Sequence, residues 1–368
     1  MICIDLGTHT TKALAFPEDQ FSAEELLSSE ITTLRTCILL KQDDQYSCGS
    51  AADSQLSIDN VLSYSAGFNR YLGHRSPVAL TNFQDVLQYF SPDDLLFRFF
   101  SEVRDIWGRK GCDSKDLSTV ALSFPASYSP SIISALYKVA ELSGFCRVRL
   151  VPEGEAAACY SLHVHKGDMG KTILIADWGW ESLRLYLLNK DSWGRYVLTE
   201  HSAIIPDLGN QNISNALIQL FMNETGITGE VLSENPDLCS GIENQINDGI
   251  TQLLQRHDIP IKVQTKSANH LFSISQAQYR NVAERATQKV KGQIERFLSE
   301  VPPALSPHNV FFVGGGSQYP FVYDSITASL PQIGFVGDKS LNSDAVIRGL
   351  GLHVSQYTSN IFYHEKYV

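Results

Sequence analysis

Short apolar runs in both halves of the chain predict buried strands that end in an acidic residue. Ile2 to Asp5 is followed by the polar turn Thr8 to Thr10 and by a second strand, Lys12 to Phe16. Thr172 to Asp177 repeats this design, and its returning strand is Leu183 to Leu188 after a turn. Apolar runs bounded by polar turn residues are typical of strands in a buried sheet. Each half is therefore predicted to begin with strand, turn and strand.

Between these two hairpins, strand patterns alternate with helix patterns. Val120 to Ser123 and Val148 to Val151 are predicted to be buried strands. The helix between them is expected to start after the N-cap residue Ser129 and to end before Gly144. A second helix is predicted over Glu155 to Leu162. Alternating strands and helices indicate an α/β layer architecture.

The second half changes character after its opening strands. From Asn212 to about Ser306 the apolar residues recur at helical spacing, so this region is predicted to be mainly helical. A strand is expected at Val310 to Val313, followed by the glycine-rich turn Gly314 to Ser317 and a helix over Phe321 to Leu330.

Length and charge limit the classes of function. The chain has 368 residues and a formal net charge of −11. At roughly 150 residues per domain, two domains or two lobes are expected. The acidic balance disfavours a broad surface for nucleic acid or anionic membrane, because both need clustered Lys and Arg. No apolar run approaches the ~20 residues of a membrane span. The seven cysteines form no C-x-x-C pair and no signal peptide is evident, which together predict a cytoplasmic protein.

Two segments have the composition of phosphate-contacting or nucleoside-contacting turns. Asp5 to Thr10 combines an acid, a glycine and hydroxyl residues, a set that suits an anion and a water-bound Mg²⁺. The glycines of Gly314 to Ser317 would let backbone approach a ligand closely. Each segment taken alone is also typical of an ordinary turn.

Five segments occur in an order that is more specific than any one of them. Together they resemble the nucleotide-binding domain of the 70-kDa heat-shock chaperones (DnaK-type), a branch of the actin-like ATPase superfamily. The resemblance spans about residues 2 to 355. The matching segments are Asp5 to Thr8, Ser123 to Tyr128, Glu153 to Ala158, Asp177 to Gly179 and Val313 to Gly315, with further likeness at Cys48 to Ala52 and Leu341 to Val346.

This resemblance implies an α/β fold of two lobes, each built on a ribonuclease-H-like mixed sheet with helices, and a cleft between the lobes. Lobe I would cover residues 1–165, with a small insertion at about 35–115. Lobe II would cover residues 166–368, with a helical insertion at about 210–305 and a final helix that returns to lobe I. The implied cofactor is ATP or ADP with Mg²⁺.

The resemblance also assigns roles to single residues. Asp5 and Asp177 would hold Mg²⁺ through water, and Glu153, with Asp177, would serve catalysis by positioning the attacking water. Residues of the two phosphate turns would bind the nucleotide, as would residues of the last glycine-rich and helical segments. These binding residues are Gly7, Thr8, His9, Thr10, Gly179, Ser182, Gly314, Gly315, Gln318 and Asp344.

The chain departs from the family at several of these places. Trp180 and Glu181 stand where the family has two glycines that touch phosphate, and Arg184 replaces an aspartate. Asn69 replaces the catalytic lysine, whose positive charge stabilises a phosphoryl transition state. Gln318 replaces an arginine that would stack on adenine. The family's charged adenine-binding helix aligns with Asn247, Ile250, Thr251 and Leu254.

Three functions therefore stay open. The first is a pseudo-ATPase that acts through a protein partner and binds nucleotide without hydrolysis or binds none. The second is an active chaperone-type ATPase that works with a separate substrate-binding partner. The third is an assembly protein of the actin superfamily. The family's peptide-binding domain is expected to be absent, because Tyr357 to Phe362 carries no acidic-apolar linker.

Overall fold

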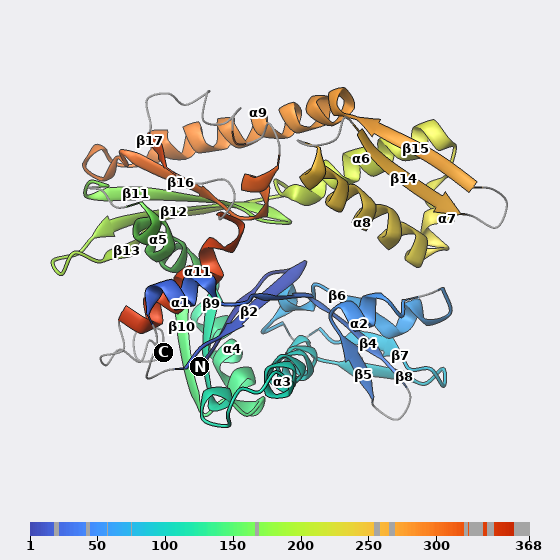
Figure 1. Ribbon diagram of the computed structural model, residues 1–368, viewed down its shortest axis with the longest axis horizontal. Coiled ribbons are helices and arrows are strands. Elements are labelled where there is room, and N and C mark those ends of the chain that lie inside the picture. Colours follow the sequence, from blue (N-terminus) through green and yellow to red (C-terminus); the bar gives the residue numbers. More distant parts are fainter. Residues whose placement is uncertain are drawn as a thin grey trace. The chain divides into compact units, whose positions relative to one another are not determined.

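The chain is mixed α/β and divides into two units (Figure 1). The computed structural model describes residues 1–17, 22–41, 45–56, 58–74, 76–165, 169–253, 258–264, 269–319, 323, 334–336 and 342–356. Unit 1 holds the described residues of Met1–Asp168, Lys190–Leu198 and Asp344–Val368, and unit 2 holds those of Met169–Asn189 and Thr199–Ser343.

A five-stranded mixed sheet forms the centre of unit 1. Its strands are β1 (Ile2–Leu6), β2 (Thr10–Ala15), β3 (Thr32–Arg35), β9 (Thr119–Phe124) and β10 (Arg147–Pro152). The order is β10-β9-β1-β2-β3, in which β1, β9 and β10 are parallel and β2 is antiparallel to β1 and β3. All six residues of β9 are buried, as expected for a parallel strand with both faces covered.

Helices pack on this sheet and on one another. α4 (Pro130–Leu142) begins as predicted, because the Ser129 side chain accepts a hydrogen bond from the backbone N–H of Ile132. α5 (Glu153–Val164) starts two residues before the predicted boundary. The helix α11 (Ala345–Gln356) packs against α5, β1 and β9. The other helices of unit 1 are α1 (Ala23–Ser28), α2 (Ser50–Asp53) and α3 (Pro92–Arg109).

Two smaller sheets complete unit 1. A three-stranded sheet has the order β5-β4-β6, and β7 pairs with β8 in a hairpin. The strands are β4 (Cys37–Leu40), β5 (Tyr46–Cys48), β6 (Tyr64–Ala66), β7 (Val78–Thr81) and β8 (Leu87–Phe90).

The second five-stranded sheet repeats the design of the first. Its order is β13-β12-β11-β16-β17, with β11 antiparallel to β12 and parallel to β16, and β16 parallel to β17. Both sheets thus place a first strand at the centre, with its hairpin partner on one side and two parallel strands on the other. The strands are β11 (Thr172–Trp178), β12 (Ser182–Lys190), β13 (Tyr196–Pro206), β16 (Asn309–Val313) and β17 (Gly334–Val336).

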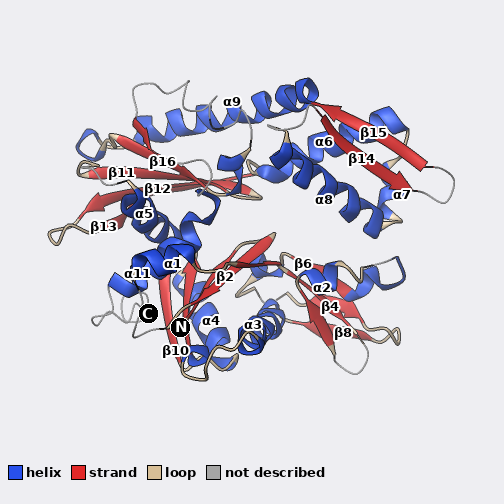
Figure 2. Ribbon diagram, in the orientation of Figure 1, coloured by secondary structure: helices blue, strands red, loops and turns tan. Residues whose placement is uncertain are grey.

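Among the residues described between Asn212 and Ser306, the prediction of a helical region is right for four helices and wrong for one hairpin (Figure 2). The hairpin consists of β14 (Asp258–Gln264) and β15 (Asn269–Ser275). Ile259, Ile261 and Val263 alternate with other residues and bury one face, a period-two signal that predicts a strand. The helices are α6 (Asn210–Thr225), α7 (Gly229–Ser233), α8 (Pro236–Gln252) and α9 (Gln276–Glu300).

Two predicted features lie outside the described residues. They are the helix over Phe321 to Leu330, of which only Tyr323 is described, and the tail from Tyr357 to Phe362. Within the described part of the chain, no helix combines the length and apolar character needed to span a membrane.

Candidate functional site

Three of the residues that the resemblance implicates lie at one edge of the unit 1 sheet. Asp5 and Ser123 are the next-to-last residues of β1 and β9, and Glu153 directly follows β10. Because these strands are parallel and in register, their carboxyl ends meet at the same edge, where α/β sheets bind ligands. Ser123 Oγ donates a hydrogen bond of 2.8 Å to Asp5 Oδ1. Glu153, the first residue of α5, is buried.

The turn between β1 and β2 is fixed by a threonine beyond it. Thr36 Oγ1 donates to the carbonyl oxygen of Gly7 at 2.7 Å, and the backbone N–H of Thr36 donates to the carbonyl oxygen of His9 at 2.9 Å. Thr36 Oγ1 also lies 2.9 Å from Thr11 Oγ1. The carbonyls of Gly7 and His9 therefore face Thr36, and Thr8 and Thr10 on the same turn are half-buried.

His9 is uncharged in this turn at neutral pH. Burial and the nearby Arg35 guanidinium lower the pKa of His9 to about 3. Both causes disfavour a second positive charge, the first through desolvation and the second through repulsion. His9 can therefore offer a neutral imidazole to a ligand but no cationic contact to a phosphate.

Asn69 lies beside the end of β1. It sits in the single turn Phe68–Tyr71, is buried, and donates through Nδ2 to the carbonyl oxygen of Leu6 at 3.3 Å. Its Oδ1 is also buried and accepts no hydrogen bond from any described residue. The residue that the resemblance aligns with a catalytic lysine is thus a neutral amide directed at the backbone.

In unit 2 the second acidic residue lies beneath the glycine-rich turn. Asp177 is paired in register with Val313, and Gly314 follows immediately. Gly314 has a φ of +85°, and a Cβ atom there would lie 2.2 Å from Asp177 Oδ1. Only glycine fits both the backbone conformation and this contact. Asp177 and Gly314 are therefore brought together, while Gly315 faces the side chain of Asn210.

The turn between β11 and β12 is held by the start of α6. Gly179 N donates to the carbonyl oxygen of Ser182 at 3.0 Å and closes the turn. Asn210 N donates to the carbonyl oxygen of Gly179 at 3.1 Å, and Gln211 N donates to that of Trp180 at 2.9 Å. Two of the N–H groups that a helix N-terminus could offer to an anion are therefore used within the protein.

Two residues of this segment are misplaced by the sequence interpretation, because Ser182 begins β12 and Trp178 lies in β11. Trp178 was predicted in the turn, but it ends β11 and is fully buried. Its indole packs against Phe312, with 6.1 Å between ring centroids, and closely against Gly316. The unbroken apolar run that precedes it is the signal that could have assigned Trp178 to the strand.

Each acidic strand end has a basic residue directly opposite it. Asp5 on β1 pairs in register with Lys12 on β2, and Asp177 on β11 pairs with Arg184 on β12. Residues opposite one another in an antiparallel pair share a face of the sheet, with Cβ atoms about 5 Å apart. Lys12 Nζ also donates to Asp344 Oδ1 at 2.8 Å, so the Asp344 carboxylate, predicted to face the nucleotide, is ion-paired.

These pairs fit a magnesium site poorly. A divalent cation beside Asp177 would meet the Arg184 guanidinium on the same face of the sheet, and one beside Asp5 would meet Lys12, whose charge is also paired with Asp344. Among the residues that the structure describes, no group of three or more His, Cys, Asp or Glu side chains could hold a metal ion.

The segments aligned with adenine recognition are engaged within unit 2. Ser214 Oγ donates to Asn247 Oδ1 at 2.7 Å, and Ile250 is fully buried. Gln318 Nε2 donates to Ser343 Oγ at 2.7 Å. Ile250 therefore belongs to the core, and Leu254 lies outside the described residues.

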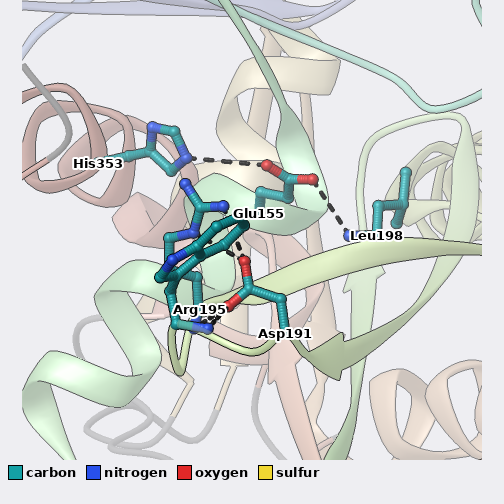
Figure 3. Close-up of polar contacts among 6 residues, drawn as sticks. Glu155, Asp191, Arg195, Leu198 and His353 are labelled. Atoms are coloured by element: carbon teal, nitrogen blue, oxygen red, sulfur yellow. Dashed lines mark hydrogen bonds and ion pairs between the residues drawn. The ribbon is translucent and has the colours of Figure 1, made fainter. Parts of the chain in front are cut away.

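A buried carboxylate in unit 1 received no role from the sequence. Figure 3 shows Glu155 of α5 between His353 of α11 and the backbone of Leu198. Its Oε2 lies 3.7 Å from His353 Nε2, and its Oε1 accepts from Leu198 N at 3.1 Å. In the same view Arg195 Nε donates to Asp191 Oδ2 at 2.8 Å. Glu155 thus joins three segments that are far apart in the chain.

Comparison of the chain with protein-family models and with curated protein sequences gives no match.

Proposed function

We propose that this protein is a pseudo-ATPase on the actin-like, two-lobed fold of the 70-kDa heat-shock chaperones, and that it acts through a protein partner. The fold part of this proposal is supported by the two five-stranded sheets, which share one strand order and one pattern of parallel and antiparallel pairing. A sheet of similar topology in each lobe is also what the resemblance to the chaperone family implies.

The proposed loss of catalysis rests on one observation, namely that a basic residue lies opposite each strand-end carboxylate. Lys12 faces Asp5 and Arg184 faces Asp177 in the strand register. Phosphoryl transfer needs carboxylates that hold Mg²⁺ against the phosphates. A cation opposite a carboxylate weakens the attraction of that carboxylate for Mg²⁺ and repels the ion. The effect is smaller at Asp5 than at Asp177, because Lys12 is also ion-paired with Asp344.

Two other polar side chains near the end of β1 carry no positive charge. Asn69 is an amide bonded to the Leu6 carbonyl, and His9 is uncharged at pH 7 because its pKa is about 3. Loss of one preorganised transition-state group commonly lowers the rate by about 10²–10³. Loss of both the metal and a lysine would leave little hydrolysis above background.

One observation favours the second candidate, an active ATPase. Asp5, Ser123 and Glu153 still meet at the carboxyl edge of the unit 1 sheet, where the family's chemistry would need them. An enzyme of this kind would bind ATP with Mg²⁺ and turn it over with the help of a partner.

Two measurements on the purified protein separate these functions. We expect the release of phosphate from ATP and Mg²⁺ to equal that of an Asp5→Asn variant, which removes one charge and leaves the side-chain shape. Turnover that Asp5→Asn abolishes would establish the active enzyme instead. A thermal shift with ATP, ADP or no nucleotide, each with Mg²⁺ or with a chelator, then tells whether nucleotide binds, because a ligand of the folded state raises the melting temperature.

A variant with an acidic residue at position 184 tests whether the Arg184 charge disfavours Mg²⁺ binding. Arg184→Asp gives the second turn the residue that the family carries there and removes the cation opposite Asp177. If repulsion by Arg184 disfavours Mg²⁺, this variant gains a Mg²⁺-dependent thermal shift with ATP that the unaltered protein lacks. A Mg²⁺-dependent shift of equal size in both proteins contradicts the explanation.

A further inference from the structure

The β7–β8 hairpin of unit 1 concentrates exposed apolar side chains. Ten large apolar residues among the described ones are exposed, and four of them fall within residues 83–89. Leu87 and Tyr89 on β8 have 52% and 66% of their surface exposed. Isolated exposed apolar residues need no explanation, but a contiguous group marks a contact surface. The four are Phe83, Val86, Leu87 and Tyr89.

The register of the hairpin puts Leu87 and Tyr89 on its outer face, while Phe83 and Val86 lie in or beside the turn. Leu80 and Phe90 are buried in the core of unit 1, and they alternate with exposed neighbours. Leu87 lies opposite Thr81, and Tyr89 lies opposite Ala79. The hairpin therefore has one face toward the core of unit 1, and Leu87 and Tyr89 are exposed on the other face.

The backbone of β8 also has a free edge. Opposite residues in an antiparallel hairpin alternate between hydrogen-bonded and non-hydrogen-bonded pairs. Asn82 N donates to the Val86 carbonyl, so the next pair, Thr81 with Leu87, is a non-hydrogen-bonded pair. By the same alternation the N–H and C=O groups of Leu87 and Tyr89 point away from β7. No described residue forms a hydrogen bond with them, and no other described strand pairs with β8.

On the other edge of the hairpin, one outward backbone group is hydrogen-bonded within unit 1. Ser63 Oγ donates to the carbonyl oxygen of Thr81, one of the outward groups of β7. Exposed edges are usually guarded by lysines, prolines or bulges. β8, with the sequence Leu-Gln-Tyr-Phe, has none of these, so its edge is open to a further strand.

The lack of charge on β8 favours an equally uncharged partner strand. Residues 78–90 contain a single charged side chain, Asp85, in a protein of net charge −11. Two copies of so acidic a protein repel each other over most of their surface, and the repulsion is smallest where an uncharged strand meets an uncharged strand. The outward backbone groups of β8 belong to residues two apart, a spacing that an antiparallel copy of the same strand matches.

We propose that β8 of one copy pairs antiparallel with β8 of a second copy, across a twofold axis at Gln88. Leu87 of each copy then lies opposite Tyr89 of the other, so both apolar residues of both strands are covered on the same face. The contact is isologous and closes as a dimer. Because one strand pair and a few side chains fall below the usual interface size of about 1,200 Å², the dimer is weak and depends on concentration.

Sedimentation velocity from about 1 to about 200 µM protein tests this pairing. The average mass of the unaltered protein should rise toward twice the monomer mass, and added salt should strengthen association by screening the net charge. Tyr89→Lys should stay monomeric over the same range. Leu142→Lys, at an exposed apolar position on α4, is the matched control and should associate like the unaltered protein. Equal melting temperatures of the two variants exclude unfolding as the cause.

The register has its own test. Gln88→Cys places one cysteine on the twofold axis, so mild oxidation should produce a covalent dimer, whereas Asp85→Cys in the turn should produce far less. An unaltered protein that stays monomeric at all concentrations, or a Tyr89→Lys variant that dimerises normally, overturns the proposal. Cross-linking that is as strong at position 85 as at 88 refutes the register.

Discussion

The contact between α5 and α11 provides a stability prediction that can be worked from geometry. Gly349 lies in the middle of α11, and a Cβ atom added there would be 1.8 Å from the carbonyl oxygen of Ala156 in α5. Ordinary contact lies near 3.5 Å, so Gly349→Ala must separate the helices by roughly 1.5 Å. The obstacle is helix backbone, which cannot turn aside as the end of a side chain can.

Two effects oppose each other in this variant. Replacing glycine with alanine inside a helix favours the helix by about 1 kcal/mol. Overpacking typically costs about 1–3 kcal/mol, and a clash with backbone belongs at the upper end or beyond. We therefore expect a net loss of about 2 kcal/mol. At about 2–4 °C per kcal/mol, the melting temperature should fall by about 4–8 °C.

Gly108→Ala is the matched control for this change. Gly108 lies in α3 of the same unit, and an added Cβ atom would meet only Leu117 Cδ1 at 3.5 Å. This variant should keep or raise the melting temperature, because the helix preference acts without a clash. Thermal unfolding followed by circular dichroism measures both. A Gly349→Ala variant that melts at or above the unaltered protein would refute the close α5–α11 contact.

The parts of the fold that depend on local chemistry were predictable from the sequence. The start of α4 follows from a serine whose side chain caps the helix and a proline at its first position, both of which act within one turn. The strands β1, β2, β9 and β11 follow from short apolar runs with polar ends. None of these features needs knowledge of a distant residue.

Whether a basic residue lies opposite Asp177 depends on a one-residue difference in the register between β11 and β12. A turn that contained Trp178 to Ser182, as predicted, would place Leu183 opposite Asp177. The strands instead include Trp178, so Arg184 is opposite Asp177. A one-residue shift in a hairpin changes every cross-strand neighbour. The electrostatic character of this site therefore follows from the burial of a tryptophan, which the sequence alone did not resolve.

Other site features depend on contacts between distant segments. Asn69 reaches the Leu6 carbonyl across 63 positions of the chain, and Glu155 meets His353 and Leu198. Sequence likeness indicated that Asn69 departs from a lysine, but only packing shows that the amide supports the end of β1. The local pattern of apolar residues predicts helices and strands well, because it reflects which residues are buried. Hydrogen bonds between distant residues depend instead on how helices and strands pack together, which the local pattern does not contain.

Three further changes test the two strand-end turns. The folded protein keeps His9 neutral down to a pKa of about 3 while the unfolded chain takes up a proton near pH 6.5, so unfolding gains a proton in acid. His9 should therefore lower the free energy of unfolding by about 1.4 kcal/mol between pH 7.5 and 5.5. Urea unfolding of His9→Gln should lose that share of the pH dependence, and an unchanged dependence contradicts the burial of a neutral imidazole. Gly314→Ala should lower the melting temperature more than Gly194→Ala, because both glycines have positive φ but an added Cβ meets no atom within 4 Å at Gly194; equal losses would remove the Asp177 contact as a cause. Asp177 and Arg184 should be coupled in a double-mutant cycle of Asp177→Asn and Arg184→Gln measured by urea unfolding. Asp177 is only 6% exposed, so each single change leaves a charge facing a neutral group in poorly screened surroundings, and the double change relieves part of that cost. We expect a coupling free energy of at least about 0.5 kcal/mol, and strictly additive effects would mean that Arg184 does not balance the Asp177 carboxylate.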